Sequence, residues 1–263
     1  MTAVVEEEAN RPAMDPRLRQ RRIEVRRQEG RRRLRKLLIA VGVLAVLGLL
    51  WGLTYSSFVD VDRVVVTGDG HTSNAEIRSA AAIGLGQPMA YLDTSAAEHR
   101  IEVLPWVASA SVHRDLPGTV SIDVVERVPI VATPIDGGGW RLFDAEGHAL
   151  GDVPALPAGV VAMSGPVKPV AVGAVVGDQQ LAAIDATALL PVPLKARVGA
   201  VAWADDGTID LQLAPAGTIR LGPPTDLPAK YLAAVAVLDE LGPDATVGVL
   251  DVRAPEAPVL SPA

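Results

Sequence analysis

The longest apolar segment of the chain lies near its N-terminus and shows no polar stripe. Residues 37–55 read LLIAVGVLAVLGLLWGLTY, and no charged residue occurs between Lys36 and Asp60. In a helix that rises about 1.5 Å per residue, a run of this length spans the roughly 30 Å hydrocarbon core of a membrane. A helix of the same length on a soluble core would show polar positions along one face. We therefore predict a transmembrane helix over residues 37–57.

Alternating apolar residues predict three strands in the segment that follows. These strands cover residues 61–66, 107–112 and 120–125. Leu116-Pro117-Gly118 forms a turn between the second and third strands, which makes these two strands neighbours in sequence.

Two helices are predicted between the first and second strands. The first begins at Ser73, because Glu76 three residues later completes a capping box. The second begins near Asp93 and ends before Pro105, because a proline disfavours the helical conformation in the residue that precedes it. Residues 58–127 are therefore predicted to form one unit with the element order β-α-α-β-β.

After residue 127 the chain becomes rich in Gly, Pro, Val and Ala, and short strand patterns alternate with turns. Apolar spacing predicts helices over residues 178–190 and 226–241. Strands are predicted at residues 198–203, 208–213, 217–221 and 247–253. We expect a second folded unit over residues 128–255 and a flexible C-terminal tail over residues 256–263.

Charge is distributed unevenly along the chain, and this asymmetry predicts the topology. Residues 1–36 hold twelve basic and six acidic side chains, whereas the rest of the chain holds twelve basic and 25 acidic ones. The positive-inside rule therefore places the N-terminus in the cytoplasm and the C-terminal domains outside. A cleaved signal peptide is the competing interpretation, but its apolar region is usually about 7–15 residues long and precedes an A-x-A site. Trp51 and Tyr55 stand where that site is needed, so we expect an uncleaved single-pass anchor.

The N-terminal segment, residues 1–36, is predicted to be a largely disordered cytoplasmic tail. Residues 1–16 are acidic and aperiodic, and the arginine-rich residues 17–36 can set topology and contact anionic lipid headgroups. Nucleic-acid binding is the alternative for the arginines. No aromatic residues lie between them, and Glu24 and Glu29 reduce their net charge, so membrane lipid is expected and nucleic acid is not.

No residue pattern predicts catalysis, a cofactor or a metal site. The chain has no cysteine, which excludes a thiol nucleophile and a thiolate metal site. Ser111, His113 and Asp115 alternate along one predicted strand, so they point the same way and do not converge as a catalytic triad must. The four histidines lie in different elements without metal-ligand spacing: His71, His99, His113 and His148.

Several phrases in the sequence resemble the FtsQ/DivIB family of cell-division proteins. They are residues 61–77 (VDRVVVTGDGHTSNAEI), 100–130 (RIEVLPWVASASVHRDLPGTVSIDVVERVPI), 142–150 (LFDAEGHAL) and 249–255 (VLDVRAP). The most specific is the pattern LPW-V-x-x-A-x-V-x-R-x-LP-G-T-V-x-I-x-V-x-E-R-x-P, from Leu104 to Pro129. The resemblance covers roughly residues 31–255. It implies an α+β fold in which a POTRA domain at 58–127 precedes a β domain at 128–255, a mixed sheet with helices on one face.

The resemblance also implies a function. A family member is a bitopic, non-enzymatic scaffold of the cell membrane and the division septum. It binds FtsB/DivIC-like and FtsL-like coiled-coil membrane proteins outside the membrane and helps to regulate septal peptidoglycan synthesis. The last strand region of its β domain receives a partner segment by β-augmentation. Matched to this sequence, the partner contacts are Leu250, Val252, Arg253, Pro258, Val259 and Leu260. Leu250 and Val252 can equally be core residues, since one face of an alternating strand is buried.

Two other functions fit the sequence less well. A membrane-anchored cell-wall hydrolase or transferase needs converging nucleophile–base or metal residues, which the sequence does not indicate. A POTRA protein of outer-membrane assembly needs tandem POTRA units and a C-terminal barrel of strands about ten residues long. The segment after Arg127 contains two predicted helices, which disfavours a barrel.

Overall fold

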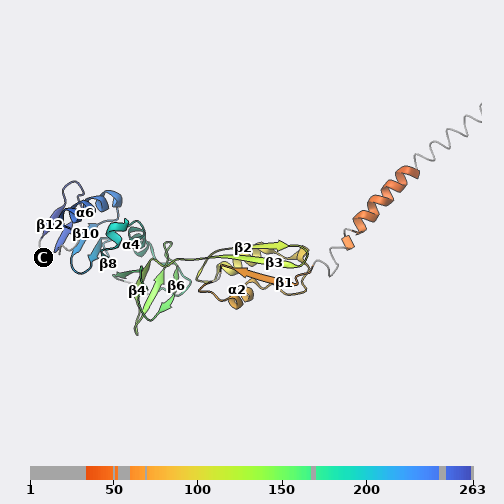
Figure 1. Ribbon diagram of the computed structural model, residues 1–263, viewed down its shortest axis with the longest axis horizontal. Coiled ribbons are helices and arrows are strands. Elements are labelled where there is room, and N and C mark those ends of the chain that lie inside the picture. Colours follow the sequence, from red (N-terminus) through yellow and green to blue (C-terminus); the bar gives the residue numbers. More distant parts are fainter. Residues whose placement is uncertain are drawn as a thin grey trace, which may run out of the picture.

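The computed structural model describes residues 34–49, 51–52, 60–68, 70–166, 170–242 and 247–261 of the 263-residue chain. Its folded part contains two β-sheets, which are joined end to end (Figure 1).

Residues 34–49 and 51–52 are helical, and every side chain described in them is exposed. None of the helices described is both long and apolar enough to cross a membrane. The rest of the predicted transmembrane segment, residues 50 and 53–57, lies outside the described residues, as does the predicted tail up to residue 33.

The first sheet has three strands in the order β1-β3-β2, and helices pack on it. Its elements in chain order are β1 (Arg63–Thr67), α2 (Asn74–Ala81), the 3-10 helix η2 (Met89–Tyr91), α3 (Thr94–Glu102), β2 (Val107–Asp115) and β3 (Thr119–Glu126). Strand β1 is parallel to β3, and β2 is antiparallel to it. The predicted β-α-α-β-β order is confirmed, with η2 added between the two helices.

Short-range hydrogen bonds explain where the two helices of this domain begin. The Ser73 side chain accepts a hydrogen bond from the backbone N–H of Glu76, and the Glu76 carboxylate accepts one from the backbone N–H of Ser73 (3.0 Å). This is the predicted capping box. Asp93 caps α3 by accepting a hydrogen bond from the backbone N–H of Ala96 (3.0 Å). Helix α2 ends where Ala82 adopts a left-handed conformation with φ of 53°.

The second sheet has nine strands in the order β12-β11-β10-β9-β8-β7-β4-β5-β6. They are β4 (Val131–Pro134), β5 (Trp140–Phe143), β6 (Ala149–Val153), β7 (Val161–Ser164), β8 (Val198–Trp203), β9 (Ile209–Leu213), β10 (Thr218–Gly222), β11 (Val249–Asp251) and β12 (Val259–Ser261). The sheet is mixed, because β4–β7, β7–β8 and β10–β11 are parallel pairs and the others are antiparallel. The predicted mixed sheet is thereby confirmed.

The C-terminal half of this domain follows the sequence-based prediction closely. Strands β8, β9 and β10 and helices α4 (Asp178–Ala188) and α6 (Leu227–Leu241) lie where periodicity predicts them. Residues 259–261 correct the prediction of a flexible tail, because they form β12. A turn in which the N–H of Ala257 donates to the carbonyl of Ala254 (3.1 Å) returns the chain alongside β11.

The helices of the second domain cover one face of its sheet. Val201, Leu211, Ile219 and Leu250 form one row across β8, β9, β10 and β11, and none of them is exposed. They share a core with α4, α6 and the short helix α5 (Val192–Lys195). On the other face, β4, β5 and β6 contribute a smaller apolar cluster, and Trp106 of the first domain packs against it.

The carboxylate of Glu126, at the end of β3, holds the loop that precedes α2. It accepts hydrogen bonds from the backbone N–H groups of Gly70 (3.1 Å), His71 (2.8 Å) and Thr72 (2.8 Å). Burial raises the pKa of this carboxyl, but the hydrogen bonds from Thr72, His71 and Gly70 together lower its pKa below the ordinary value. The ionised form of Glu126 therefore stabilises the fold.

We expect Glu126→Gln to lower the free energy of unfolding at pH 7 by roughly 1.5–3 kcal/mol, the range for hydrogen bonds to a charged group. Because the pKa of Glu126 is lowered in the folded state, its contribution is present above the ordinary value of 4.5 and is lost as the pH falls through the folded value. Urea unfolding of both proteins at pH 7 and at pH 3 measures this. A difference in stability that stays the same at pH 3 contradicts the role of the charge.

Candidate partner-binding edge

Strand β12 is the outermost strand of the nine-stranded sheet, at the end far from the first domain (Figure 1). It pairs with β11 through Val259–Asp251, Leu260–Leu250 and Ser261–Val249. All three residues of β12 are exposed, and the exposed fractions of Val259 and Leu260 are 60% and 41%. The edge therefore presents apolar side chains beside its backbone.

Leu260 extends the core row of the sheet out to this edge. Directly paired residues of antiparallel strands share a face, so Leu260 lies on the helix-covered face beside the buried Leu250. Leu260 thus continues the row formed by Val201, Leu211, Ile219 and Leu250. Among the described residues, Leu260 has a neighbouring strand on one side only. An added strand could cover Leu260 by supplying the next apolar side chain.

The structure separates the predicted contact residues into two groups. Leu250 and Val252 have no exposed surface and belong to the core, which answers the alternative that the sequence left open. Their side chains cannot reach a partner without unfolding the domain. The other four predicted residues are exposed, namely Arg253, Pro258, Val259 and Leu260. Their contact with a partner stays a prediction.

The face of the edge away from the helices is charged. Asp210, Arg220 and Asp251 are neighbours in register across β9, β10 and β11. The Arg253 guanidinium donates to the Asp251 carboxylate (2.6 and 3.0 Å), and this side-chain hydrogen bond is the main cause of the lowered pKa of Asp251. Burial is the main cause of the raised pKa of Asp210. The edge is therefore apolar on the helix side, and on the other side charged side chains lie beside the exposed Val259.

The edges of β2 and β6 are covered by the chain itself. At the edge of β2, the backbone N–H of Val112 donates to the Glu98 carboxylate of α3 (2.8 Å). At the edge of β6, residues 173–174 exchange hydrogen bonds of 2.7 and 2.9 Å with Ala149. No segment of the chain within the described ranges covers β12 in this way. Because an exposed edge is a template for pairing, β12 is the candidate docking strand.

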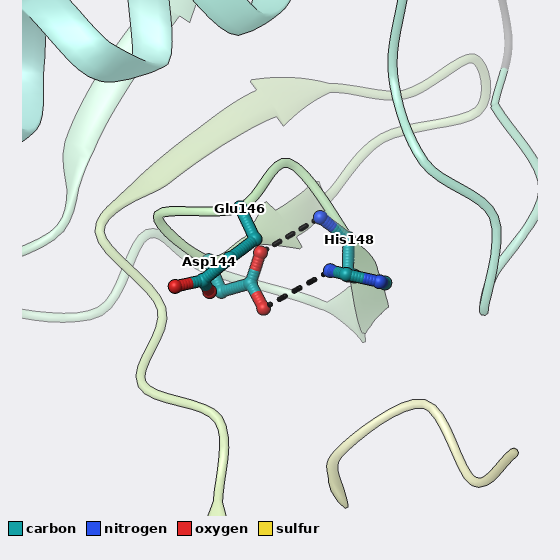
Figure 2. A group of neighbouring side chains, drawn as sticks. All are labelled: Asp144, Glu146 and His148. Atoms are coloured by element: carbon teal, nitrogen blue, oxygen red, sulfur yellow. Dashed lines mark hydrogen bonds and ion pairs between the residues drawn. The ribbon is translucent and has the colours of Figure 1, made fainter. Parts of the chain in front are cut away.

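Two acidic side chains and a histidine come together in the turn between β5 and β6, as the ligands of a metal ion would. The ligand atoms of Asp144, Glu146 and His148 lie within 4.8 Å of one another (Figure 2). However, Nη1 of Arg127 lies 2.7 Å from Asp144 Oδ2, 2.9 Å from His148 Nδ1 and 3.9 Å from Glu146 Oε2. An arginine cation already occupies the centre of this group, so we assign it a structural role.

Ser111, His113 and Asp115 lie along β2 and contact β3 rather than each other. Asp115 accepts a hydrogen bond from the Ser121 hydroxyl (2.5 Å), and His113 Nε2 lies 3.9 Å from Asp123. This arrangement does not provide a nucleophile next to a base.

A second exposed apolar surface lies between α5 and α6 and was not predicted from the sequence. It is a cavity of about 340 Å³. Its lining includes Leu189, Pro191, Pro193, Tyr231 and Leu232. Nothing in the pattern of α6 alone distinguishes this surface, because it depends on how α5 packs against α6.

Comparison with known proteins adds to this geometry. Residues 59–127 match a family described as "POTRA domain, FtsQ-type". The chain is 34% identical over 213 residues to the cell division protein FtsQ of Rhodothermus marinus, which covers 77% of this chain and 75% of that protein. It is 33% identical over 224 residues to FtsQ of Mycolicibacterium smegmatis, which covers 84% of this chain and 62% of that protein. FtsQ of Mycobacterium tuberculosis is 29% identical over 230 residues. The chain thus spans less than two thirds of the length of the Mycolicibacterium relative.

Leu250 of β11 and Leu260 of β12 are paired, but replacing each by alanine should change the free energy of unfolding by very different amounts. Leu250→Ala creates a cavity in the core and should lower the free energy of unfolding by about 2–5 kcal/mol. Leu260→Ala removes a side chain that is 41% exposed and should change it by no more than about 0.5–1 kcal/mol. Chemical unfolding of the two variants measures this, and equal losses would contradict the assignment of Leu260 to the surface.

Proposed function

The chain belongs to the FtsQ family of cell division proteins, and from this premise we propose that it is a membrane-anchored scaffold of the division machinery. Its role in cell division follows from the family. We further propose that its N-terminus is cytoplasmic, that both folded domains lie outside the cell membrane, and that it concentrates at the division septum. The uncharged run at 37–55 and the basic residues before it support this topology.

We propose that FtsB/DivIC-like and FtsL-like coiled-coil membrane proteins are its partners, and that an extended segment of one of them pairs with β12. The single observation that carries this proposal is the uncovered edge, where the core row ends at the exposed Leu260. A partner strand gains affinity from backbone hydrogen bonds and specificity from alternating side chains. On the helix side it should place an apolar residue beside Leu260, and on the other side it meets Val259 and the charged Asp251–Arg253 pair.

The protein would act by binding rather than by catalysis. It would position its partners outside the membrane and so help to regulate septal peptidoglycan synthesis. The hydrolase or transferase alternative gains no support from Ser111, His113 and Asp115, which contact β3 instead of converging.

Leu260→Asp should weaken capture of the coiled-coil partner at least about tenfold, because it puts a carboxylate in the apolar row that the partner covers. The measurement is the dissociation constant of full-length protein in nanodiscs for the purified partner. Val192→Asp is the matched control, because Val192 is an apolar residue of α5 with 82% of its surface exposed. Circular dichroism verifies that both variants are folded. Partner affinity that Leu260→Asp leaves unchanged, or that Val192→Asp reduces equally, would falsify the edge as the docking site.

A further inference from the structure

The two domains meet at a junction where one arginine contacts both sheets. Arg127 directly follows β3, and its Nε donates to the carbonyl of Val107 at the start of β2 (3.0 Å). Its Nη1 donates to Asp144 Oδ2 (2.7 Å) and to His148 Nδ1 (2.9 Å), both of which belong to the turn between β5 and β6. A single guanidinium thus ties the first sheet to the second.

This ionic contact is shielded from water. The exposed fraction of the side chain is 14% for Arg127 and 2% for Asp144. The second carboxylate oxygen of Asp144 accepts a hydrogen bond from the backbone N–H of His148 (2.7 Å), which fixes the orientation of the carboxylate. Charge-assisted hydrogen bonds in such a setting are strong and directional. The contact therefore restricts rotation of one sheet against the other.

A separate apolar contact lies beside it. Trp106 packs against the cluster of Ala132, Leu142 and Leu150 on β4, β5 and β6. Its ring also stacks on His71 of the first domain, with ring centroids 4.1 Å apart and planes 2° from parallel. Gly151 permits the close approach, since a Cβ there would lie 3.3 Å from Trp106 Nε1.

The segment that connects the two sheets is short and is hydrogen-bonded at both ends. Strand β3 ends at Glu126 and β4 begins at Val131. Within this connection, the N–H of Arg127 donates to the carbonyl of Trp106 (2.8 Å), and the N–H of Ile130 donates to the carbonyl of Phe143 (2.9 Å). The connection is thus bound to one domain at its start and to the other at its end.

We propose that Arg127 and Trp106 lock the two domains into one rigid body. Relative motion is the usual behaviour of domains that share a small interface. Here an ionic contact and an apolar contact act at different points of the junction, so together they oppose both twisting and bending. Consequently, a partner held by the first domain and one held by β12 are kept at a fixed separation and orientation. This inference concerns the junction and does not depend on which partner binds.

Spin-label distance measurements on the full-length protein in nanodiscs test the lock. The chain has no cysteine, so Ser111→Cys in β2 and Gln212→Cys in β9 label one exposed position in each domain. The parent should show a single narrow distance distribution. Arg127→Met should abolish the single narrow peak in favour of a broad distribution. Arg141→Met is the matched control, because Arg141 pairs with Asp152 within the second sheet (2.7 Å), and its distribution should stay narrow.

Asp144→Asn provides a second variant in case Arg127→Met does not fold. It keeps a hydrogen-bond acceptor but removes the charge that Arg127 contacts, so it should also broaden the distribution. Thermal unfolding verifies that each labelled variant is folded. A broad distribution in the parent overturns the proposal, as does a distribution that stays narrow in folded Arg127→Met or Asp144→Asn protein.

Discussion

Two adjacent side chains, the last of β3 and the one that follows it, hold the two folded domains of this chain together. Glu126 binds three successive backbone N–H groups of the first domain, and Arg127 binds Asp144 and His148 of the second. The two side chains are adjacent in the chain but act on different contacts, since Glu126 holds a loop within the first domain and Arg127 reaches the second. Together with the Trp106 contact, Arg127 sets the position of every later strand, including β12, relative to the first domain.

The sheet edges differ in whether another part of the chain covers their backbone hydrogen-bonding groups. An unpaired strand edge invites pairing, and proteins usually protect it. Here a glutamate from α3 protects β2, and residues 173–174 protect β6. Strand β12 instead ends the sheet with Leu260 exposed at the end of a buried row. The contrast with β2 and β6, together with the exposed leucine, is what supports the proposal that β12 is the docking strand.

Local signals in the sequence predicted much of this fold, and tertiary contacts account for the rest. The capping box of Ser73 and Glu76 lies within four residues, and the strand patterns at 198–203 and 208–213 are long enough to read, so α2, β8 and β9 could be predicted. The four-residue strands β4, β5 and β7 are too short for alternation to reveal, and the parallel pairs β4–β7 and β7–β8 join segments that are distant in sequence. Strand β12 was missed because prolines flank it. The burial of Leu250 and Val252 could have been predicted from the sequence. Asp251 between them marks the solvent-facing side, and its two neighbours therefore point into the core. The Arg127 contacts could not be predicted, because Asp144 and His148 reach it only through the fold.

The most direct test of the central claim is the position of the protein in living cells. A fluorescent protein is fused to the N-terminus, and the fusion replaces the native protein in a depletion strain, in the parent form and with Leu260→Asp. The account predicts that the parent fusion forms a mid-cell band before constriction and restores division. It predicts that cells with the Leu260→Asp fusion at equal abundance grow as filaments. A uniform membrane signal with normal division after depletion would contradict the account.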